Sequence, residues 1–121
     1  MSSQAKLTVR GNIVHAETRA GMDISKADVD RLFEIVNERA LGEFGLIEIR
    51  PKEVSIDPAS YRYAKELMPQ LRVFALVAES ELTFKVFESE TAFMRDLRFG
   101  IFKTLAEAES WMKSELESEL P

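Results

Sequence analysis

Apolar and polar positions divide the chain into short strand-like segments and longer segments with helical spacing. Residues 6–16 alternate apolar and polar side chains around a Gly-Asn pair, a pattern that predicts a β-hairpin. Residues 46–50 are rich in Leu and Ile and end at a proline, and residues 73–78 form a continuous apolar run. Both segments are typical of strands buried inside a sheet. We expect a last strand over residues 97–102, which contain Gly100.

Two helices are predicted in the first half of the chain by their start signals and by apolar positions at i, i+3, i+4 and i+7. The first runs over residues 25–41, with a serine as N-cap and an acidic first turn, and we expect Gly42 to end it. The second runs over residues 57–68. Asp57 is its expected N-cap and Pro58 its first helical residue, where the missing N–H costs nothing.

The third predicted helix begins after Ser80 and is apolar over more than one side. Leu82, Val86 and Phe93 share one face, whereas Phe84 and Phe87 cannot both lie on that face. An apolar arc of this width favours three interpretations, which the sequence leaves open: a docking or self-association surface, a lid over an apolar ligand, or a wide core helix.

The fourth predicted helix covers residues 104–116. Thr104 and Glu107 form a capping-box pattern before an apolar stripe with helical spacing. The predicted order is therefore ββαβαβαβα. Helices that alternate with short buried strands indicate an α/β fold, with a mainly parallel mixed sheet of four to five strands, about four helices, and the hairpin at an antiparallel edge.

Composition narrows the classes of function. The chain has 121 residues, of which 45% are hydrophobic and 31% charged, so we expect one domain over residues 1–121 with a core over about 6–116. Cysteine is absent, and no apolar stretch is long enough to span a bilayer or resembles an export signal. We therefore expect a cytoplasmic protein with no membrane span. A net charge of -5 opposes binding to nucleic acid.

The order of segments resembles a known family. The hairpin, the capped first helix, the strands at 46–50 and 73–78, and the segment 102–112 with its capping threonine and Trp111 together resemble small bacterial STAS-like proteins. These are relatives of the sporulation anti-anti-sigma factor and are often grouped with the lipid-binding SEC14 fold. The resemblance extends from about Lys6 to Leu116 and implies a STAS/SpoIIAA-like fold.

The resemblance also implies a functional turn before the second helix. Regulatory members of the family carry an Asp-Ser-Ser-Gly-type turn there, and phosphorylation of a serine abolishes docking to a kinase partner. This chain has Asp57, Pro58, Ala59 and Ser60 at the matching place, so it lacks the usual phosphoacceptor serine. Ser60 is expected to serve as an ordinary first-turn residue. As a partner-docking turn we name Asp57, Ser60 and Tyr61.

The sequence contains no complete catalytic motif. His15 is the single histidine, and we expect it to be exposed or on an edge strand. Glu48 and Asp57 flank the turn before the second helix, and a carboxylate pair there is the remaining enzymatic option. Carboxylates that are solvated or cap a helix are far commoner, so we expect a protein that is not an enzyme and that uses no cofactor or metal.

Two hypotheses of function follow. The first is a cytoplasmic protein-interaction or regulatory module that docks a protein partner or a second copy through the Asp57-to-Tyr63 segment and the third helix. The alternative is binding of a lipid or small apolar ligand beneath the third helix, as in SEC14-like proteins. The residues expected to form that ligand site or interface are Phe84, Phe87, Phe93 and Met94.

Overall fold

A computed structural model describes residues 5–19, 21, 23–51, 55–56, 59–90 and 98–117. The strands in this part of the chain are β1 (Lys6–Arg10), β2 (Ile13–Glu17), β3 (Asp23–Ile24), β4 (Phe44–Arg50), β5 (Ser55–Ile56), β6 (Leu71–Ala78) and β7 (Arg98–Phe102). The helices are α1 (Lys26–Glu38), α2 (Ala59–Leu67), α3 (Glu81–Glu90) and α4 (Leu105–Glu117). The predicted α/β order of a hairpin followed by alternating helices and strands is confirmed.

Five strands form one mixed sheet in the order β1-β2-β4-β6-β7. The hairpin strand β1 is antiparallel to β2 and forms one edge, as predicted, and the other neighbours are parallel. A separate two-stranded parallel pair, β3 with β5, lies outside this sheet. The parallel strands β2, β4, β6 and β7 follow one another across the sheet in chain order. Right-handed crossovers between them therefore place the intervening helices on one side of the sheet.

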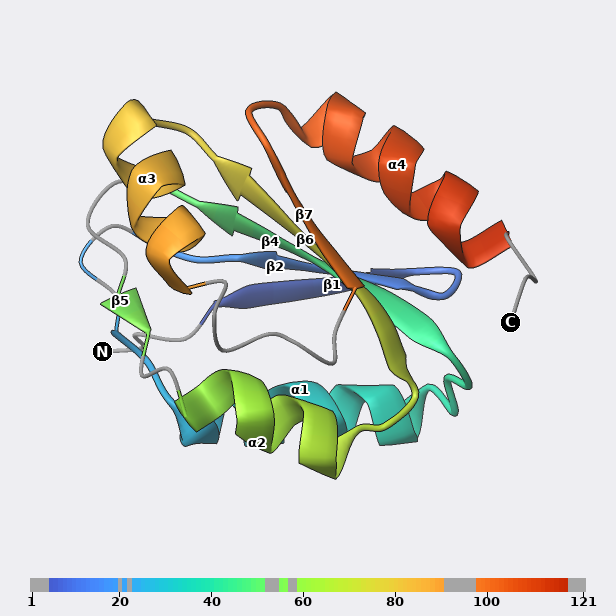
Figure 1. Cartoon of the computed structure of the whole chain (residues 1–121). Helices are drawn as coiled ribbons and strands as arrows, with labels where there is room; N and C mark the ends of the chain where they lie inside the picture. The colour runs from blue at the N-terminus through green and yellow to red at the C-terminus, as the bar shows by residue number, and fades with distance from the viewer. Residues whose placement is uncertain are drawn as a thin grey trace.

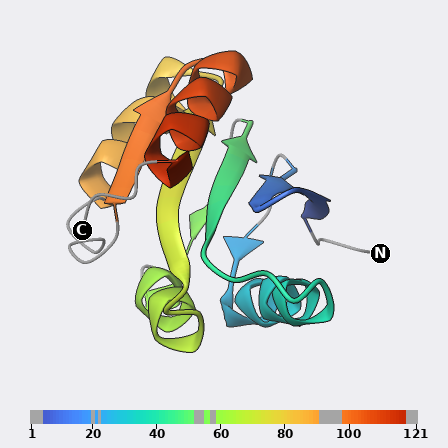
Figure 2. The ribbon, with the colours of Figure 1, turned by 90° about the vertical axis from the view of Figure 1, so that its right-hand side faces the viewer.

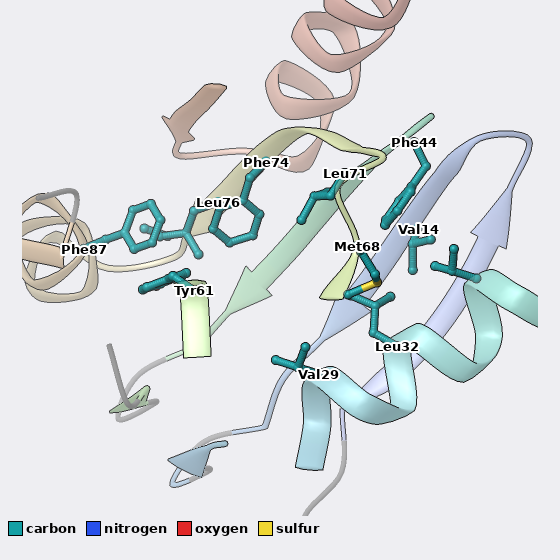
Figure 3. Close-up of a cluster of buried hydrophobic side chains, with 12 residues drawn as sticks. Val14, Val29, Leu32, Phe44, Tyr61, Met68, Leu71, Phe74, Leu76 and Phe87 are labelled. Carbon is teal, nitrogen blue, oxygen red and sulfur yellow. The ribbon is translucent and has the colours of Figure 1, made fainter. Parts of the chain in front are cut away.

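The two faces of the sheet carry different cores. Helices α1 and α2 lie together beneath one face, and α4 lies on the other side (Figures 1 and 2). The α1/α2 face buries a cluster that includes Val14, Leu32, Phe74 and Leu76, several of which Figure 3 shows between the sheet and α1. The α4 face buries Ile13, Ile47, Val73, Val77, Ala108 and Met112. The alternation of side chains along each strand thus supplies both cores.

Helix α1 ends differently from the prediction. The left-handed conformation falls at Ala40, with φ of 51°, and Gly42 is not the residue that stops the helix. The amide of Leu41 donates to the carbonyl of Val36, five residues earlier, at 3.1 Å, as in the Schellman motif at helix ends. Leu41 packs against the α1/α2 core, and the left-handed residue that turns the chain lies just before it.

The structure shows which apolar side of helix α3 faces the core, a choice that the sequence left open. Leu82 is 73% exposed and Val86 is 41% exposed, whereas Phe87 is fully buried. Phe87 contacts Tyr61 and Phe74 with ring centroids 6.4 and 6.0 Å away. The side of α3 that carries Phe87 therefore packs on the core, and the side that carries Leu82 and Val86 faces outward.

Candidate ligand-binding cavity

Strand β4 places two charged side chains on an otherwise apolar face of the sheet. Leu46, Glu48 and Arg50 point to the α1/α2 face because alternate residues of a strand share a face. Both side chains are charged, yet Glu48 is only 6% exposed and Arg50 only 1% exposed, because their strand is buried on both sides. Buried charges of this kind are retained only when they are paired.

Arg50 pairs with Glu48 and ties β4 to helix α2. Its Nε donates to the Glu48 carboxylate, and its Nη2 donates to the Tyr61 hydroxyl at 2.7 Å. The guanidinium carbon lies 5.1 Å from the centre of the Phe87 ring, in a cation–π arrangement. The two charges of the pair thus offset each other, and a carboxylate, a phenol hydroxyl and an aromatic ring all contact the guanidinium.

A cavity of about 80 Å³ lies between the sheet and helices α1 and α2, beside this pair. Its lining is mainly apolar and includes Ala16, Leu32, Leu46, Ala64 and Phe74. The polar part of the lining comes from Thr18, Asp28, Arg31, Glu48, Ser60 and Tyr61. Figure 3 shows Val29 and Leu32 of α1 and Tyr61 and Phe74 around this part of the core. Three small residues leave the space unfilled: Ala5 before β1, Ala16 on β2 and Ala64 on α2.

Ser60 brings a hydroxyl without a partner into this cavity. It lies in the first turn of α2, is 1% exposed, and its Oγ makes no hydrogen bond to the described residues. By contrast, the Thr18 hydroxyl donates to the Ile49 carbonyl at 2.8 Å. A buried polar atom left unpaired costs about 1–3 kcal/mol. Such an atom in a cavity wall marks a place where a bound molecule or a water makes the missing bond.

Two half-buried charges line the same cavity at the start of α1, and both are engaged. The Asp28 carboxylate accepts from the Ser25 amide at 2.9 Å and from its hydroxyl at 3.3 Å, which closes the predicted helix cap. The Arg31 guanidinium donates to the Ala5 carbonyl. The lining thus carries one negative and one positive side chain at this end, and each already bonds a neighbouring segment.

Helices α1 and α2 are joined along the outside of the cavity. The Tyr63 hydroxyl on α2 donates to the Asp30 carboxylate on α1, and Lys26 lies 5.5 Å above the Tyr63 ring. The hydrogen bond to Asp30 raises the pKa of the Tyr63 phenol above its usual value, since ionisation places two negative charges side by side. This contact fixes the spacing of the two helices that form the cavity walls.

Comparison with known proteins identifies the fold. No protein-family model matches the chain, and no curated protein is significantly similar to it. Among solved structures, the chain resembles the crystal structure of an uncharacterised protein of the DUF3478 family from Shewanella loihica PV-4, described as having a SpoIIAA-like fold. The match has a TM-score of 0.57 and 12% identity, and it covers 93% of this chain and 98% of that chain. The fold is SpoIIAA-like. At this identity the likeness shows the fold, and function has to be argued from the site.

Within this SpoIIAA-like fold, the sequence-predicted docking turn is only partly described. Ser60 and Tyr61 are both buried, with 1% and 6% exposure, and their side chains line the cavity. Asp57 lies outside the described residues. The prediction that this turn docks a protein partner therefore stays a prediction.

The predicted aromatic group on α3 is also divided. Phe87 is fully buried in the core and Phe84 is half-buried beside Lys103, and neither lines the cavity. Phe93 and Met94 lie outside the described residues. A ligand site or interface formed by these four residues stays a prediction, and the cavity that the structure does show lies against α1 and α2.

His15 and Glu48 do not form a joint site. His15 is 8% exposed on β2, inside the sheet, so the expectation of an exposed or edge-strand imidazole is wrong. Its Nε2 lies 3.2 Å from the Glu109 carboxylate on α4, whereas Glu48 points to the opposite face. Among the described residues, no three His, Asp or Glu side chains are grouped to hold a metal ion. No helix in that same part is long and apolar enough to cross a membrane.

Sequence reasoning missed Arg50 and Thr18 as parts of the site. The signal for Arg50 was present: a strand in which positions 46, 48 and 50 share a face places a glutamate and an arginine side by side beneath a helix. The role of Thr18 depends on the position of α1 relative to the end of β2, and no local pattern signals it.

Proposed function

We propose that this protein binds a small, mainly apolar molecule in the cavity between the sheet and helices α1 and α2. The observation that carries the proposal is the cavity itself, with apolar walls and one buried, unpartnered hydroxyl at Ser60. Pockets with apolar linings and a few placed polar groups are typical of small-molecule sites. The site differs in place from the one expected beneath the third helix, but the class of ligand is the same as in our alternative hypothesis.

The volume limits what enters. A cavity of about 80 Å³ is smaller than the cavity of about 150 Å³ that accommodates benzene in a protein core, and is too large to be filled by one water, which occupies about 30 Å³ in the liquid. It therefore accommodates a group of a few heavy atoms. The cavity is only partly enclosed, so a longer ligand can place one end inside and leave the rest toward the surface.

Binding is tested with a hydrocarbon probe and a variant that fills the space. We expect n-pentane, which can place one end of its chain inside, to shift the amide NMR signals of residues around the cavity in the unmodified protein. Ala64→Leu adds three carbons to a residue that lines the cavity and should abolish these shifts. Ala106→Leu makes the same change on the exposed surface of α4 and should leave them intact. Absence of shifts in the unmodified protein contradicts the proposal.

A second candidate function is self-association through α3. Leu82 and Val86 lie one turn apart and are 73% and 41% exposed, which forms an apolar pair on a helix surface. A second copy of the chain supplies the same pair across a two-fold axis, so the surface is self-complementary. This proposal retains the interaction-module hypothesis in its homodimer form.

The oligomeric state tests this second candidate. Sedimentation at micromolar to millimolar concentrations should show a dimer that Leu82→Asp removes. Leu105→Asp changes another exposed leucine, at the start of α4, and should leave the dimer unchanged. A monomer at every concentration contradicts self-association.

A further inference from the structure

We infer that the ligand of this cavity is an uncharged molecule with a short apolar end, held by one hydroxyl or carbonyl group that bonds to Ser60. This inference rests on the proposed function and names the chemical class of the ligand. It excludes carboxylates, phosphates and amines as the group that enters. Three features of the site carry it.

The first feature is the charge balance at the inner end of the cavity. Glu48 is the charged residue that lines it there, and its carboxylate is paired with Arg50. The Arg50 guanidinium also bonds Tyr61 and lies over Phe87. Because the pair is neutral as a whole, it offers no free counter-charge to an ammonium group or to a carboxylate group that enters the cavity. Either ion is buried without a matching counter-charge.

The second feature is the other pair of charges in the lining. Asp28 caps the start of α1 through the Ser25 amide and hydroxyl, and Arg31 binds the Ala5 carbonyl. One residue is negative and the other positive, so they add no net charge to the cavity. Asp28 and Arg31 are three residues apart on α1 and therefore neighbours on its surface, so an ion bound at one of them lies beside a like charge on the other.

The third feature is Ser60, the polar residue of the lining whose hydroxyl makes no hydrogen bond to the described residues. Its hydroxyl is one O–H donor and two acceptor lone pairs, and none is used by the described residues. A hydroxyl ligand can donate to it or accept from it, and a carbonyl ligand can accept from it. The surrounding walls from Leu46, Ala64 and Phe74 offer only apolar contact. The site therefore recognises one uncharged polar group on an apolar body.

Four linear five-carbon probes test this inference: n-pentane, 1-pentanol, pentanoate and pentylamine, each titrated at pH 7 and followed by amide NMR shifts. We expect 1-pentanol to bind about tenfold or more tightly than either ion. Ser60→Ala should weaken 1-pentanol by about threefold to tenfold and leave n-pentane unchanged. Because the Ser60 hydroxyl has no partner, its removal is not expected to unfold the protein, and Ser60→Cys provides a second variant with similar volume and a weak hydrogen-bonding atom.

Thr83→Val is the matched control, since it removes a buried hydroxyl that bonds Ser80 and does not line the cavity. It should leave the affinities of all four probes unchanged. Failure of every probe, n-pentane included, overturns the proposed function. Binding of n-pentane together with binding of pentanoate or pentylamine as tight as that of 1-pentanol, or tighter, overturns this inference alone. A preference for 1-pentanol that survives Ser60→Ala also overturns it, because Ser60 then holds only a water.

Discussion

The buried Glu48–Arg50 pair gives the sharpest test of the structure. Removing either partner leaves an uncompensated charge in an apolar core, whereas removing both leaves none. We therefore compare three variants: Glu48→Leu, Arg50→Met and the double variant. The double variant should be more stable than either single variant, although it carries one more substitution.

The magnitude follows from burial. Breaking a buried ion pair by removing one partner costs about 3–5 kcal/mol, and replacing both ions by apolar side chains of similar volume is often neutral or stabilising. Arg50 is 1% exposed and Glu48 is 6% exposed, so both charges are removed from water and the large values apply. The double variant also leaves the Tyr61 hydroxyl without Arg50, at a cost of about 1–3 kcal/mol.

Urea unfolding at 25 °C, followed by circular dichroism, measures these differences. Arg98→Met is the control, because Arg98 pairs with Glu115 on the surface and its side chain is 66% exposed. That variant should lose about 1 kcal/mol or less. A double variant less stable than both single variants, or a single Arg50→Met variant as mild as Arg98→Met, refutes the burial argument.

Four further predictions concern packing and helix ends, and all are checked by the same unfolding experiment. Gly45→Ala should cost about 1–3 kcal/mol, because a Cβ at Gly45 would lie 2.5 Å from the Met112 Sδ, and Met112→Ala should relieve the clash as a second substitution. Ala40→Gly should raise the free energy of unfolding by about 1 kcal/mol, since φ of 51° is costly for alanine; no gain contradicts this. Leu76→Ala, at a fully buried position, should cost about 2–5 kcal/mol. Thr104→Ala should cost about 1 kcal/mol, because the Glu107 amide loses its bond to the Thr104 hydroxyl at 3.2 Å. Equal and small losses of stability for Leu76→Ala and Thr104→Ala would contradict the assignment of β6 as a core strand.

The order of elements was predictable because each strand carries its own signal. The alternation over residues 6–16 gave the hairpin, and the apolar run 73–78 gave a strand that the structure extends to Leu71–Ala78. The rotation of α3 was not predictable. That helix has two apolar sides, and the choice between Leu82 and Phe87 depends on the space left by Tyr61 and Phe74, which come from other elements.

The end of α1 shows the same limit on a smaller scale. Gly42 is the residue that local preference favours for the left-handed position, because glycine has no Cβ. The structure uses Ala40 instead, and Leu41 then packs on the core. Full burial of a leucine stabilises by about 1.5–3 kcal/mol, so even the partly buried Leu41 offsets much of the cost of about 1–2 kcal/mol for a left-handed alanine. Tertiary packing therefore decides where the helix stops.

The cavity was the least predictable feature, because a cavity forms where side chains from different segments do not fill the space between them. Ala5, Ala16 and Ala64 come from segments far apart in the sequence, and each is an ordinary small residue in its own pattern. The space appears only when the sheet and two helices bring them together. The pairing of Glu48 with Arg50, by contrast, follows from the period of two along one strand and was open to prediction.

The ion pair also explains why a first-turn serine faces inward. Arg50 holds the Tyr61 hydroxyl from β4, and this bond fixes the rotation of α2 about its axis at the residue that follows Ser60. With Tyr61 held against the sheet, Ser60 lies in the cavity wall and not at the surface, where first-turn serines usually act as caps. The Glu48–Arg50 pair, although its burial costs desolvation energy, thus positions the hydroxyl of Ser60 in the cavity wall. This is consistent with the rule that function depends on the residues of a site and not on the fold, here SpoIIAA-like, that carries them.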